Sequence, residues 1–346
     1  MRGRDFLSIT DVSPEELALV LRTTLALKAL RLAQGQRLSE GSLPAGAGGR
    51  PFGKLRAGSE GRPYAGGSGV GEGPLAGKTL ALVFEKPSLR TRVSFDVAMR
   101  ELGGHCIYLS PPEVGLGERE TPADVARVLS RYVDAIAART FAHETLEVLA
   151  RWSEVPVINA LSDGEHPCQA LADLQTVLER EGRLAGVTLA FVGDGNNVAR
   201  SLCLGAAMSG MHFRIASPAG YELPVAVVAR AEELARASGG SVTLLREPQE
   251  AAVDADVLYT DVWASMGQER ESAVRREAFD GYQVDEKLMS LAKPDAIFMH
   301  DLPAHRGEEV AEEVMDGPQS VVFEQAENRM HAQKALLALI LAEEVV

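Results

Sequence analysis

The stretch KTLALVFEKPSLRTRVSF, residues 78–95, connects an apolar strand to a helix through a polar loop. We expect the strand at 78–84 and the helix from Thr91, because the apolar run stops where Lys, Arg and hydroxyl residues begin. In the loop, Ser88, Arg90 and Thr91 can direct backbone N–H groups, hydroxyls and a guanidinium at one phosphate. The pattern predicts an anion site at the end of a strand, and a solvated helix cap is the alternative.

Strands and helices alternate in the same way along most of the chain. Repeated β-α units are typical of parallel sheets with helices on both faces, and 346 residues exceed the usual size of one domain. We therefore predict an α/β protein with two doubly wound parallel sheets. Because such sheets place their sites at the carboxyl ends of the strands, the candidate loops follow Phe84, Ala138, Ala160, Val192, Thr260 and Met299.

The first helix is followed by a segment of different composition. Ser13, Pro14 and Glu16 belong to a capping box that predicts a helix from Pro14 to about Arg31. Residues 32–77 are then rich in Gly, Pro, Ser and Arg without apolar periodicity, which predicts a flexible surface insertion. A nucleic-acid-binding arm is the alternative for its basic residues.

The charge balance and the cysteines exclude several classes of function. Thirty-five Lys and Arg against 49 Asp and Glu give a net charge of −14, which would repel a nucleic acid. No apolar run approaches the roughly 18 residues that span a bilayer, and the first residues lack the apolar core of a signal peptide, so we expect a cytoplasmic protein. Cys106, Cys168 and Cys203 are scattered, which favours reduced thiols over a disulfide framework or a zinc site.

A second candidate loop lies in SDGEHPCQALADL, residues 162–174. His166 precedes a proline at the first helical position, so its side chain and that of Gln169 should lie on the entry turn, facing the strand ends. A polar helix cap is the alternative. No second His or Cys stands at metal-ligand spacing from His166, which disfavours zinc.

Residues 191–201, FVGDGNNVARS, match a dinucleotide-binding turn only in part. Val198 stands where the third glycine of G-x-G-x-x-G would be, and the following strand ends without the expected ribose-binding acid. Asn196 and Asn197 could instead present amides to a zwitterionic ligand, or cap the helix that follows.

Two further loops carry acids. The stretch YTDVWASMGQE contains Asp261, Ser265 and Met266, and the stretch FMHDLPAHRGEE contains Asp301 and Leu302. An acid in each of two adjacent loops suits an amino-bearing substrate, because a carboxylate can pair with an ammonium or accept a proton from an amine. Solvated loop acids are the alternative.

Six motifs, taken in order, resemble the aspartate/ornithine carbamoyltransferase family: S-x-R-T-R, Arg139-Thr140, H-P-x-Q, D-x-x-x-S-M-G, H-x-L-P and E-N-R. The resemblance covers nearly the whole chain except residues 32–77 and is closest to the members that carbamoylate ornithine. It implies a first domain, 1–165 with 326–346, that binds carbamoyl phosphate, and a second domain, 166–325, that binds ornithine. It also implies a last helix that returns to the first domain, trimers or assemblies of trimers, and no metal or organic cofactor.

The same resemblance implies roles for individual residues. The ligands of carbamoyl phosphate would be Ser88, Leu89, Arg90, Thr91, Arg139, His166, Gln169 and Arg329. The ligands of ornithine would be Asn197, Asp261, Ser265, Met266, Asp301 and Leu302. The catalytic groups would be Arg139, His166, Asp301 and Arg329, and the products would be citrulline and phosphate.

Two positions depart from the family pattern. Leu89 replaces the threonine of S-T-R-T-R, so one hydroxyl is lost while the backbone N–H remains. Asp301 replaces the cysteine of H-C-L-P and adds a carboxyl group close to Asp261. Other functions stay open: a carbamoyltransferase for putrescine or an acylated ornithine, an NAD-dependent oxidoreductase, or a non-catalytic paralogue. Aspartate fits less well as an acceptor, since a dicarboxylate requires arginines where D-x-x-x-S-M-G stands.

Overall fold

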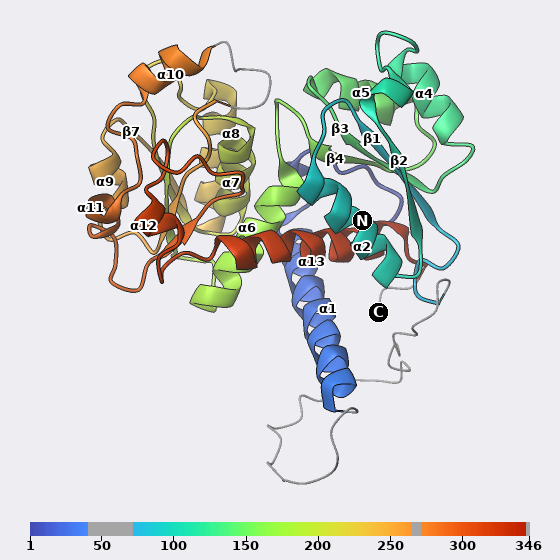
Figure 1. Cartoon of the computed structure of the whole chain (residues 1–346), viewed down its shortest axis with the longest axis horizontal. Coiled ribbons are helices and arrows are strands. Elements are labelled where there is room, and N and C mark those ends of the chain that lie inside the picture. Colours follow the sequence, from blue (N-terminus) through green and yellow to red (C-terminus); the bar gives the residue numbers. More distant parts are fainter. Residues whose placement is uncertain (41–71, 265–270, 344–346) are drawn as a thin grey trace.

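The computed structural model describes residues 1–40, 72–264 and 271–343, with residues 34–40 as backbone only. Two parallel sheets form the centres of two α/β domains (Figure 1). The first sheet has the order β2-β1-β3-β4, with β1 at Thr79–Phe84, β2 at His105–Leu109, β3 at Ala135–Arg139 and β4 at Val157–Leu161. The second has the order β7-β6-β5-β8-β9, with β5 at Thr188–Val192, β6 at His212–Ala216, β7 at Ser241–Leu245, β8 at Val257–Tyr259 and β9 at Ile297–Met299. The prediction of two parallel sheets is confirmed.

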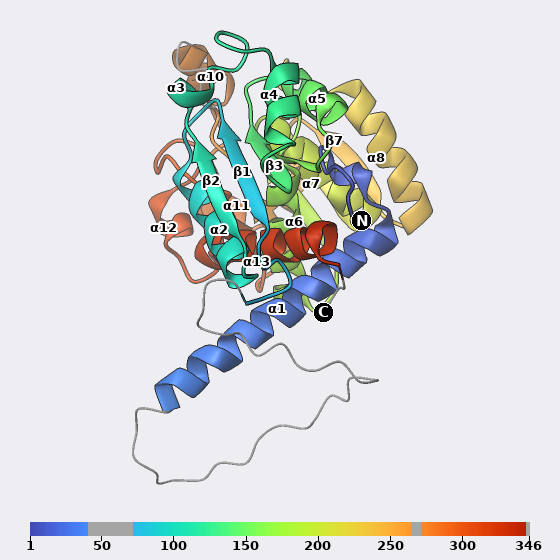
Figure 2. The ribbon, with the colours of Figure 1, turned by 90° about the vertical axis from the view of Figure 1, so that its right-hand side faces the viewer.

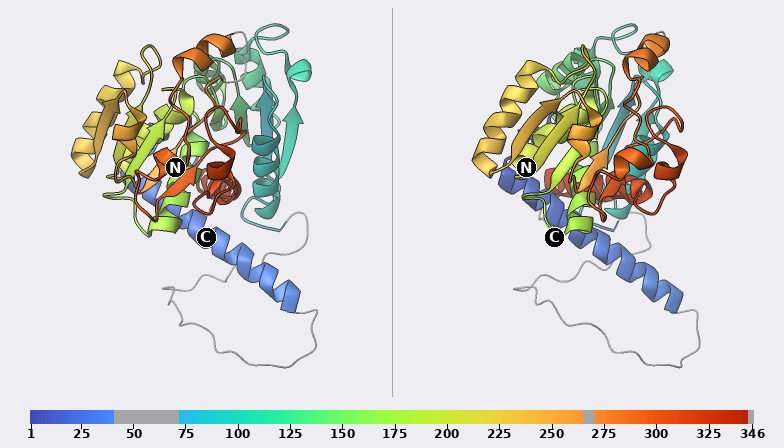
Figure 3. Two further views of the ribbon diagram at one scale, coloured as in Figure 1. Left: turned by 60° about the vertical axis from the view of Figure 1, so that its left-hand side comes forward. Right: turned by 90° about the vertical axis from the view of Figure 1, so that its left-hand side faces the viewer.

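Helices cover the sheets, and Figure 3 shows the yellow to orange strands of the second sheet side by side, with helices on either side. The first domain carries η1 (Ile9–Asp11), α1 (Pro14–Glu40), α2 (Leu89–Glu101), α3 (Pro111–Val114), α4 (Pro122–Leu129) and α5 (His143–Trp152). The connecting helix is α6 (Pro167–Glu181). Then follow α7 (Asn197–Met208), α8 (Val225–Ser238), α9 (Pro248–Ala252), α10 (Ser272–Ala278), α11 (Glu286–Met289), α12 (Glu312–Met315) and α13 (Val322–Leu341). Among the described residues, no helix combines the length and apolarity needed to cross a membrane.

The strand register brings the candidate loops together within each sheet. In the first sheet Phe84 pairs with Arg139, so the loops after β1 and β3 begin side by side. In the second sheet Tyr259 pairs with both Phe191 and Met299, so the loops after β5, β8 and β9 also share one edge. The carboxyl ends of parallel strands therefore gather the polar loops, as the β-α pattern predicts.

The last helix, α13, connects the two domains. It packs against α6, α2 and α1, and Figure 1 shows it in red, running beneath both domains. Its apolar run 335–340 is buried, and Lys334 donates to a Glu101 oxygen of α2 at 2.7 Å. The predicted return of the last helix to the first domain is confirmed, although α13 begins at Val322 rather than at the expected Ala326.

The first helix is longer than the sequence pattern suggests. The expected end of α1 near Arg31 is wrong, because the helix continues to Glu40 and projects from the body of the protein (Figure 2). Residues 32–40 are mostly Leu, Ala, Gln, Arg and Glu, which are good helix formers, with one glycine. The expected insertion of residues 32–77 therefore starts inside a helix. Its part from 41 to 71 lies outside the described residues, and Leu75 near its end is buried in the core.

The three cysteines are free thiols. Burial raises the pKa of each, Cys106, Cys168 and Cys203, to about 12. The thiols are therefore protonated at neutral pH and are poor nucleophiles.

Candidate active site

One cavity of about 900 Å³ lies between the two domains, at the carboxyl ends of both sheets. Residues from distant parts of the sequence line it. The first domain contributes Ser88, Leu89, Arg90 and Arg139, the second contributes Asn197, Asp261, Asp301 and Leu302, and the two connecting helices contribute His166 and Arg329. Most of the residues singled out in the sequence are thus brought to one place. Ser265 and Met266 lie outside the described residues.

The loop after β1 forms one end of the cavity. Ser88 caps α2: its Oγ accepts from the Thr91 backbone N–H at 3.3 Å and donates to Thr91 Oγ1 at 3.0 Å. The side chain of Leu89 is exposed, and Arg90 lines the cavity. Arg92 points elsewhere and stacks on the Tyr108 ring, 3.9 Å from its centroid. The capping interpretation of this loop is confirmed, and Ser88 caps α2 while it also lines the cavity.

Positive charge is concentrated around this end. Burial and then the neighbouring Arg329 lower the pKa of Arg139 to about 10. Arg139 Nε is buried and has no hydrogen-bond partner among the described residues. An anion placed here would satisfy donors and offset the mutual repulsion of the cations.

Lys86 is a cavity residue to which the sequence analysis assigned no role. Burial and then Arg139 lower the pKa of its ammonium group to about 8, and the group stands 5.0 Å from the centre of the Phe141 ring. The sequence feature that points to a role for Lys86 is its place in the loop that follows β1. Its ammonium group is therefore held less tightly in the charged form by its buried position and by the neighbouring guanidinium of Arg139.

Arg329 and His166 stand at the middle of the cavity. Arg329 Nη1 donates to Gln169 Oε1 at 2.7 Å and Nη2 donates to Thr91 Oγ1 at 2.8 Å. Gln169 and Thr91 are fully buried behind Arg329 and do not line the cavity themselves. Burial and then the charge of Arg329 lower the pKa of His166 well below its usual value, so the imidazole is neutral. The backbone N–H of His166 donates to Ser201 Oγ at 2.9 Å, which ties this turn to α7.

A buried acid, Asp173, lies behind Gln169 and was missed in the sequence. Its Oδ1 accepts from Gln169 Nε2 at 2.8 Å and from Gln325 Nε2 at 2.7 Å. The Tyr259 hydroxyl donates to Oδ2 at 3.2 Å. The sequence feature that could have identified Asp173 is its spacing of four residues from Gln169, because this spacing places the two side chains on one face of a helix.

The loops after β5 and β8 form the acidic end. Asp261 Oδ2 accepts from Asn196 Nδ2 at 2.7 Å. Asn196 Oδ1 also caps α7 by accepting from the Val198 and Ala199 N–H groups. Asn197 lines the cavity while its Nδ2 donates to the Ser162 carbonyl oxygen at 2.6 Å. The capping interpretation holds for Asn196, and the same side chain also orients Asp261.

Asp301 completes the acidic end from the loop after β9. Burial and then the negative charge of Asp261 raise the pKa of Asp301 well above its usual value, which favours the protonated acid. The adjacent His300 accepts at Nδ1 from the Leu302 N–H at 2.9 Å, and its Nε2 lies 3.2 Å from Glu309 Oε1. Leu302 has φ +62°, a strained value for a branched residue, and these contacts hold that turn.

Asp261, His300 and Asp301 bring possible metal-ligand atoms within 4.8 Å of one another. Both ring nitrogens of His300 are already used, one as acceptor from Leu302 and the other against Glu309. The cluster is better described as a hydrogen-bonded arrangement than as a metal centre.

The partial dinucleotide fingerprint has a packing explanation. A Cβ added at Gly195 would lie 2.4 Å from the backbone nitrogen of Leu223, so only glycine fits there. The glycine is required by the close approach of two loops, with no need for a pyrophosphate.

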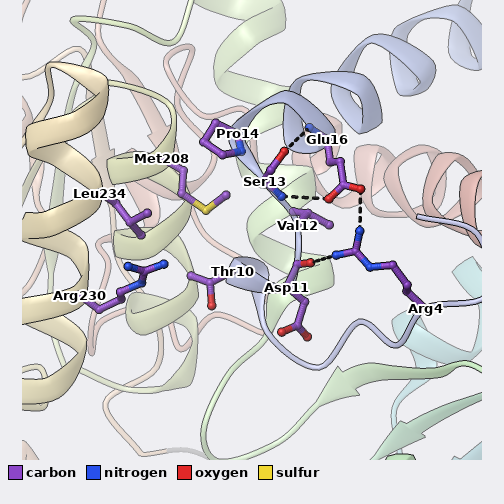
Figure 4. Close-up of a pocket in the computed structure, with 10 residues that line it drawn as sticks. All are labelled: Arg4, Thr10, Asp11, Val12, Ser13, Pro14, Glu16, Met208, Arg230 and Leu234. Carbon is purple, nitrogen blue, oxygen red and sulfur yellow. Dashed lines mark hydrogen bonds and ion pairs between the residues drawn. The ribbon is translucent and has the colours of Figure 1, made fainter.

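Another cavity, of about 580 Å³, lies where the N-terminal segment meets α7 and α8 (Figure 4). Arg4 pairs with Glu16 at 2.6 Å. Ser13 and Glu16 cap each other's backbone N–H groups, and Arg230 pairs with Glu233 at 3.0 Å. These charged groups have partners, in contrast to the Nε atom of Arg139 in the larger cavity, which has none among the described residues.

Comparisons with known proteins agree over nearly the full length of the chain. Residues 4–179 match the family model "Aspartate/ornithine carbamoyltransferase, carbamoyl-P binding domain", and residues 185–340 match "Aspartate/ornithine carbamoyltransferase, Asp/Orn binding domain". The chain is 49% identical to an ornithine carbamoyltransferase of Anoxybacillus flavithermus over 99% of this chain and 98% of that one. It is 57% identical to an anabolic ornithine carbamoyltransferase of Pyrococcus furiosus over 77% of this chain and 85% of that one.

Solved structures give the same result. An ornithine carbamoyltransferase from Pyrococcus furiosus superposes with a TM-score of 0.85 at 48% identity, covering 98% of this chain and 97% of that one. The enzyme of the same name from Thermus thermophilus superposes with a TM-score of 0.79 at 43% identity, covering 97% and 98%.

Proposed function

The chain belongs to the aspartate/ornithine carbamoyltransferase family, and from this premise we propose that it transfers the carbamoyl group of carbamoyl phosphate to the δ-amine of L-ornithine. The products are L-citrulline and phosphate. The observation that carries the proposal is a single cavity with a cationic end on the first domain and an acidic end on the second. Such a cavity suits an anionic donor and an amino-bearing acceptor.

The cationic end is assigned to carbamoyl phosphate. We assign residues 1–165 with 326–346 to this domain. Ser88, Arg90, Thr91 and Arg139, together with the backbone N–H of Leu89, would hold the phosphate at the N-terminus of α2. The replacement of threonine by leucine at position 89 leaves that backbone donor in place.

The middle of the cavity is assigned to the carbamoyl group. Attack of a neutral amine on the carbamoyl carbon develops negative charge on its oxygen, and donors aimed at that oxygen stabilise the tetrahedral state. Arg139 and Arg329 supply cationic N–H groups, and neutral His166 supplies a hydrogen-bonding nitrogen. Gln169 would act on the carbamoyl group through Arg329, whose guanidinium it holds. Phosphate leaves while the arginines neutralise its charge, and these steps need no metal or organic cofactor.

The acidic end is assigned to ornithine, within residues 166–325. Asn197, Asp261, Ser265, Met266, Asp301 and Leu302 would bind the acceptor. Since the structure favours a protonated Asp301, the pair with Asp261 carries one negative charge, which matches one ammonium group. A neutral Asp301 thereby resembles the thiol that the family pattern has at this position.

We also propose that the chain forms trimers. Leu89 is 77% exposed, Val93 on the same helix is 49% exposed, and Ile107 on the edge strand β2 is 48% exposed. These apolar side chains lie on the first domain, with Leu89 at the cavity itself. A partner subunit that covered them would also border the cavity. We further propose a cytoplasmic location, on the composition and the three reduced cysteines.

The test is a colorimetric citrulline-type assay with carbamoyl phosphate and a panel of amines: ornithine, putrescine, N-acetylornithine and aspartate. We expect ornithine to give the highest kcat/KM, and Arg139→Ala to abolish the signal. A preference for another amine would overturn the acceptor. No product with any amine would identify a non-catalytic paralogue, and tight dinucleotide binding would support the oxidoreductase alternative.

A further inference from the structure

We propose that Asp173 is a positioning residue for carbamoyl transfer, which holds the Gln169 amide with its oxygen toward Arg329 and its NH₂ group away from the cavity. Asp173 is fully buried and does not line the cavity. It therefore acts through Gln169 on Arg329, which lines the cavity. The inference rests on the function proposed above, because Arg329 is a group assigned there to the carbamoyl oxygen.

The orientation of Gln169 follows from the chemistry of its two neighbours. Above its pKa of about 7 the Asp173 carboxylate only accepts hydrogen bonds, and a guanidinium only donates them. Asp173 Oδ1 therefore faces the Gln169 NH₂ group at 2.8 Å, and Arg329 Nη1 faces the Gln169 oxygen at 2.7 Å. One amide rotamer satisfies both contacts, and the flipped rotamer satisfies neither. The oriented amide thereby holds the guanidinium of Arg329, which lines the cavity.

Asp173 also connects the elements that carry the two ends of the cavity. Gln325 of α13 donates to Asp173 Oδ1 at 2.7 Å, and its own Oε1 accepts from the His300 N–H at 2.9 Å, directly before Asp301. The hydroxyl of Tyr259, two residues before Asp261, donates to Oδ2 at 3.2 Å. One carboxylate thus links α6 to α13 and to the strand β8 that precedes the acidic loop. Such a shared contact fixes the relative position of groups on separate elements.

The electrostatics show that the buried position of Asp173 disfavours its ionised form. Burial raises the pKa of Asp173 from 3.8 to about 7, against the lowering effect of the donors Gln169, Gln325 and Tyr259. The charged or titratable groups that face it are Arg329 from α13, Tyr259 from β8 and Asp301 from the loop after β9. Since the folded protein binds this proton more tightly than the unfolded chain, the contribution to stability is lost as the pH rises toward 7. Stability alone therefore does not explain an acid at this position.

The chain offers a matched control on the same helix. Glu179 accepts a hydrogen bond from Gln175 Nε2, four residues earlier, at 3.1 Å. It also accepts one from Asn328 Nδ2 of α13 at 2.9 Å. It does not line the cavity. Glu179→Gln therefore removes a comparable partly buried acid in a comparable network, away from the site.

The experiment measures kcat/KM for carbamoyl phosphate and the Ki of inorganic phosphate at pH 8 in the purified wild type, Asp173→Leu, Asp173→Asn and Glu179→Gln, and the melting temperature shows whether each variant is folded. Asparagine keeps one oxygen for the two amide donors, so Asp173→Asn should stay close to wild type, whereas leucine offers them no acceptor. We expect Asp173→Leu to lower kcat/KM about 10- to 100-fold, a typical cost of a misplaced contact group. The Ki of phosphate should stay within about twofold, because the phosphate ligands are untouched. Glu179→Gln should leave both constants near wild type.

Each outcome of this experiment either supports or overturns the positioning role of Asp173. An unchanged kcat/KM in folded Asp173→Leu, an equal loss of phosphate affinity, or an equal effect of Glu179→Gln would overturn the positioning role. A wild type without carbamoyltransferase activity would overturn the proposed function instead. Tyr259→Phe gives a second measurement that leaves Asp173 in place. It removes one donor to the carboxylate, so the acid limb of the kcat/KM profile should move to higher pH, and an unmoved limb would also overturn the proposal.

Discussion

At the scale of single residues, Asp301 shows how a carboxylic acid can occupy a position where a thiol is usual. Burial and Asp261 keep the pKa of Asp301 high, so it stands beside the acceptor as a neutral hydrogen-bonding group. We expect Asp301→Asn, which is neutral at every pH, to retain most of the turnover of ornithine near neutrality. Asp301→Ala should lose about 10²- to 10⁴-fold, the range for a group that orients or exchanges a proton. Equal rates for alanine and wild type would make Asp301 a bystander.

The same residue predicts a pH dependence of stability. A raised pKa means that the folded protein holds the proton more tightly than the unfolded chain does. The stabilisation is present at low pH and is lost as the pH rises through the raised pKa of Asp301. Urea unfolding from pH 5 to 9 should therefore show a smaller loss of stability with rising pH in Asp301→Asn than in wild type. Parallel curves for the two proteins would contradict a high pKa.

Two neighbouring arginines provide a test of the phosphate end. Arg90 lines the cavity, whereas Arg92 stacks on Tyr108. We expect Arg90→Ala to weaken phosphate binding by about 1.5–3 kcal/mol, the contribution of a charge-assisted contact. Arg92→Ala should leave the Ki of phosphate within about twofold. Equal losses in both variants would mean that the effect is long-range electrostatics and not contact.

The S-x-R-T-R motif shows what a local pattern can and cannot predict at this scale. The pattern placed Ser88, Arg90 and Thr91 at a strand-to-helix turn, and the structure places them there. It could not show that Thr91 turns inward to Arg329, because that contact joins residues 238 positions apart. The same holds for Asp173, two of whose partners, Tyr259 and Gln325, come from distant parts of the chain.

At the scale of elements, α13 couples packing to chemistry, because the helix that fills the core also carries Arg329. Leu337 is fully buried on it, and Phe323 is 67% exposed. We expect Leu337→Ala to lower the free energy of unfolding by about 2–5 kcal/mol through the cavity it leaves. Phe323→Ala should change it by about 0.5 kcal/mol or less. Urea denaturation measures both, and similar values for the two would contradict the packing described for α13.

Element ends explain where the sequence pattern succeeded and failed. Proline and threonine at helix starts marked α4 and α6 well, since capping chemistry is local. The end of α1 carried no such mark, and helix-forming residues extend it to Glu40. The start of α13 was also missed, because Val321 offers no side-chain cap to signal it. Boundaries set by tertiary packing leave little local trace.

At the scale of the whole molecule, the apolar rim of the first domain consists of the exposed side chains of Leu89, Val93 and Ile107. It predicts where the subunits of the proposed trimer meet. We expect Val93→Glu with Ile107→Glu to shift the protein from a trimer to smaller species in light scattering, because each buries a charge in the proposed contact. Val225 on α8 is 86% exposed and lies on the second domain, away from that rim. Val225→Glu should leave the assembly unchanged. A double variant that stays trimeric would move the contact elsewhere.

The order of residues along the chain has a consequence for biosynthesis. Arg329 is the last of the cavity residues to leave the ribosome, and its partners Thr91 and Gln169 are made much earlier. The first sheet can form while synthesis continues, since domains generally fold as units from the N-terminal side. Its donor pocket nevertheless stays incomplete until α13 emerges and docks. A chain that ends before α13 would thus lack the Arg329 contacts, and we expect it to lack carbamoyltransferase activity.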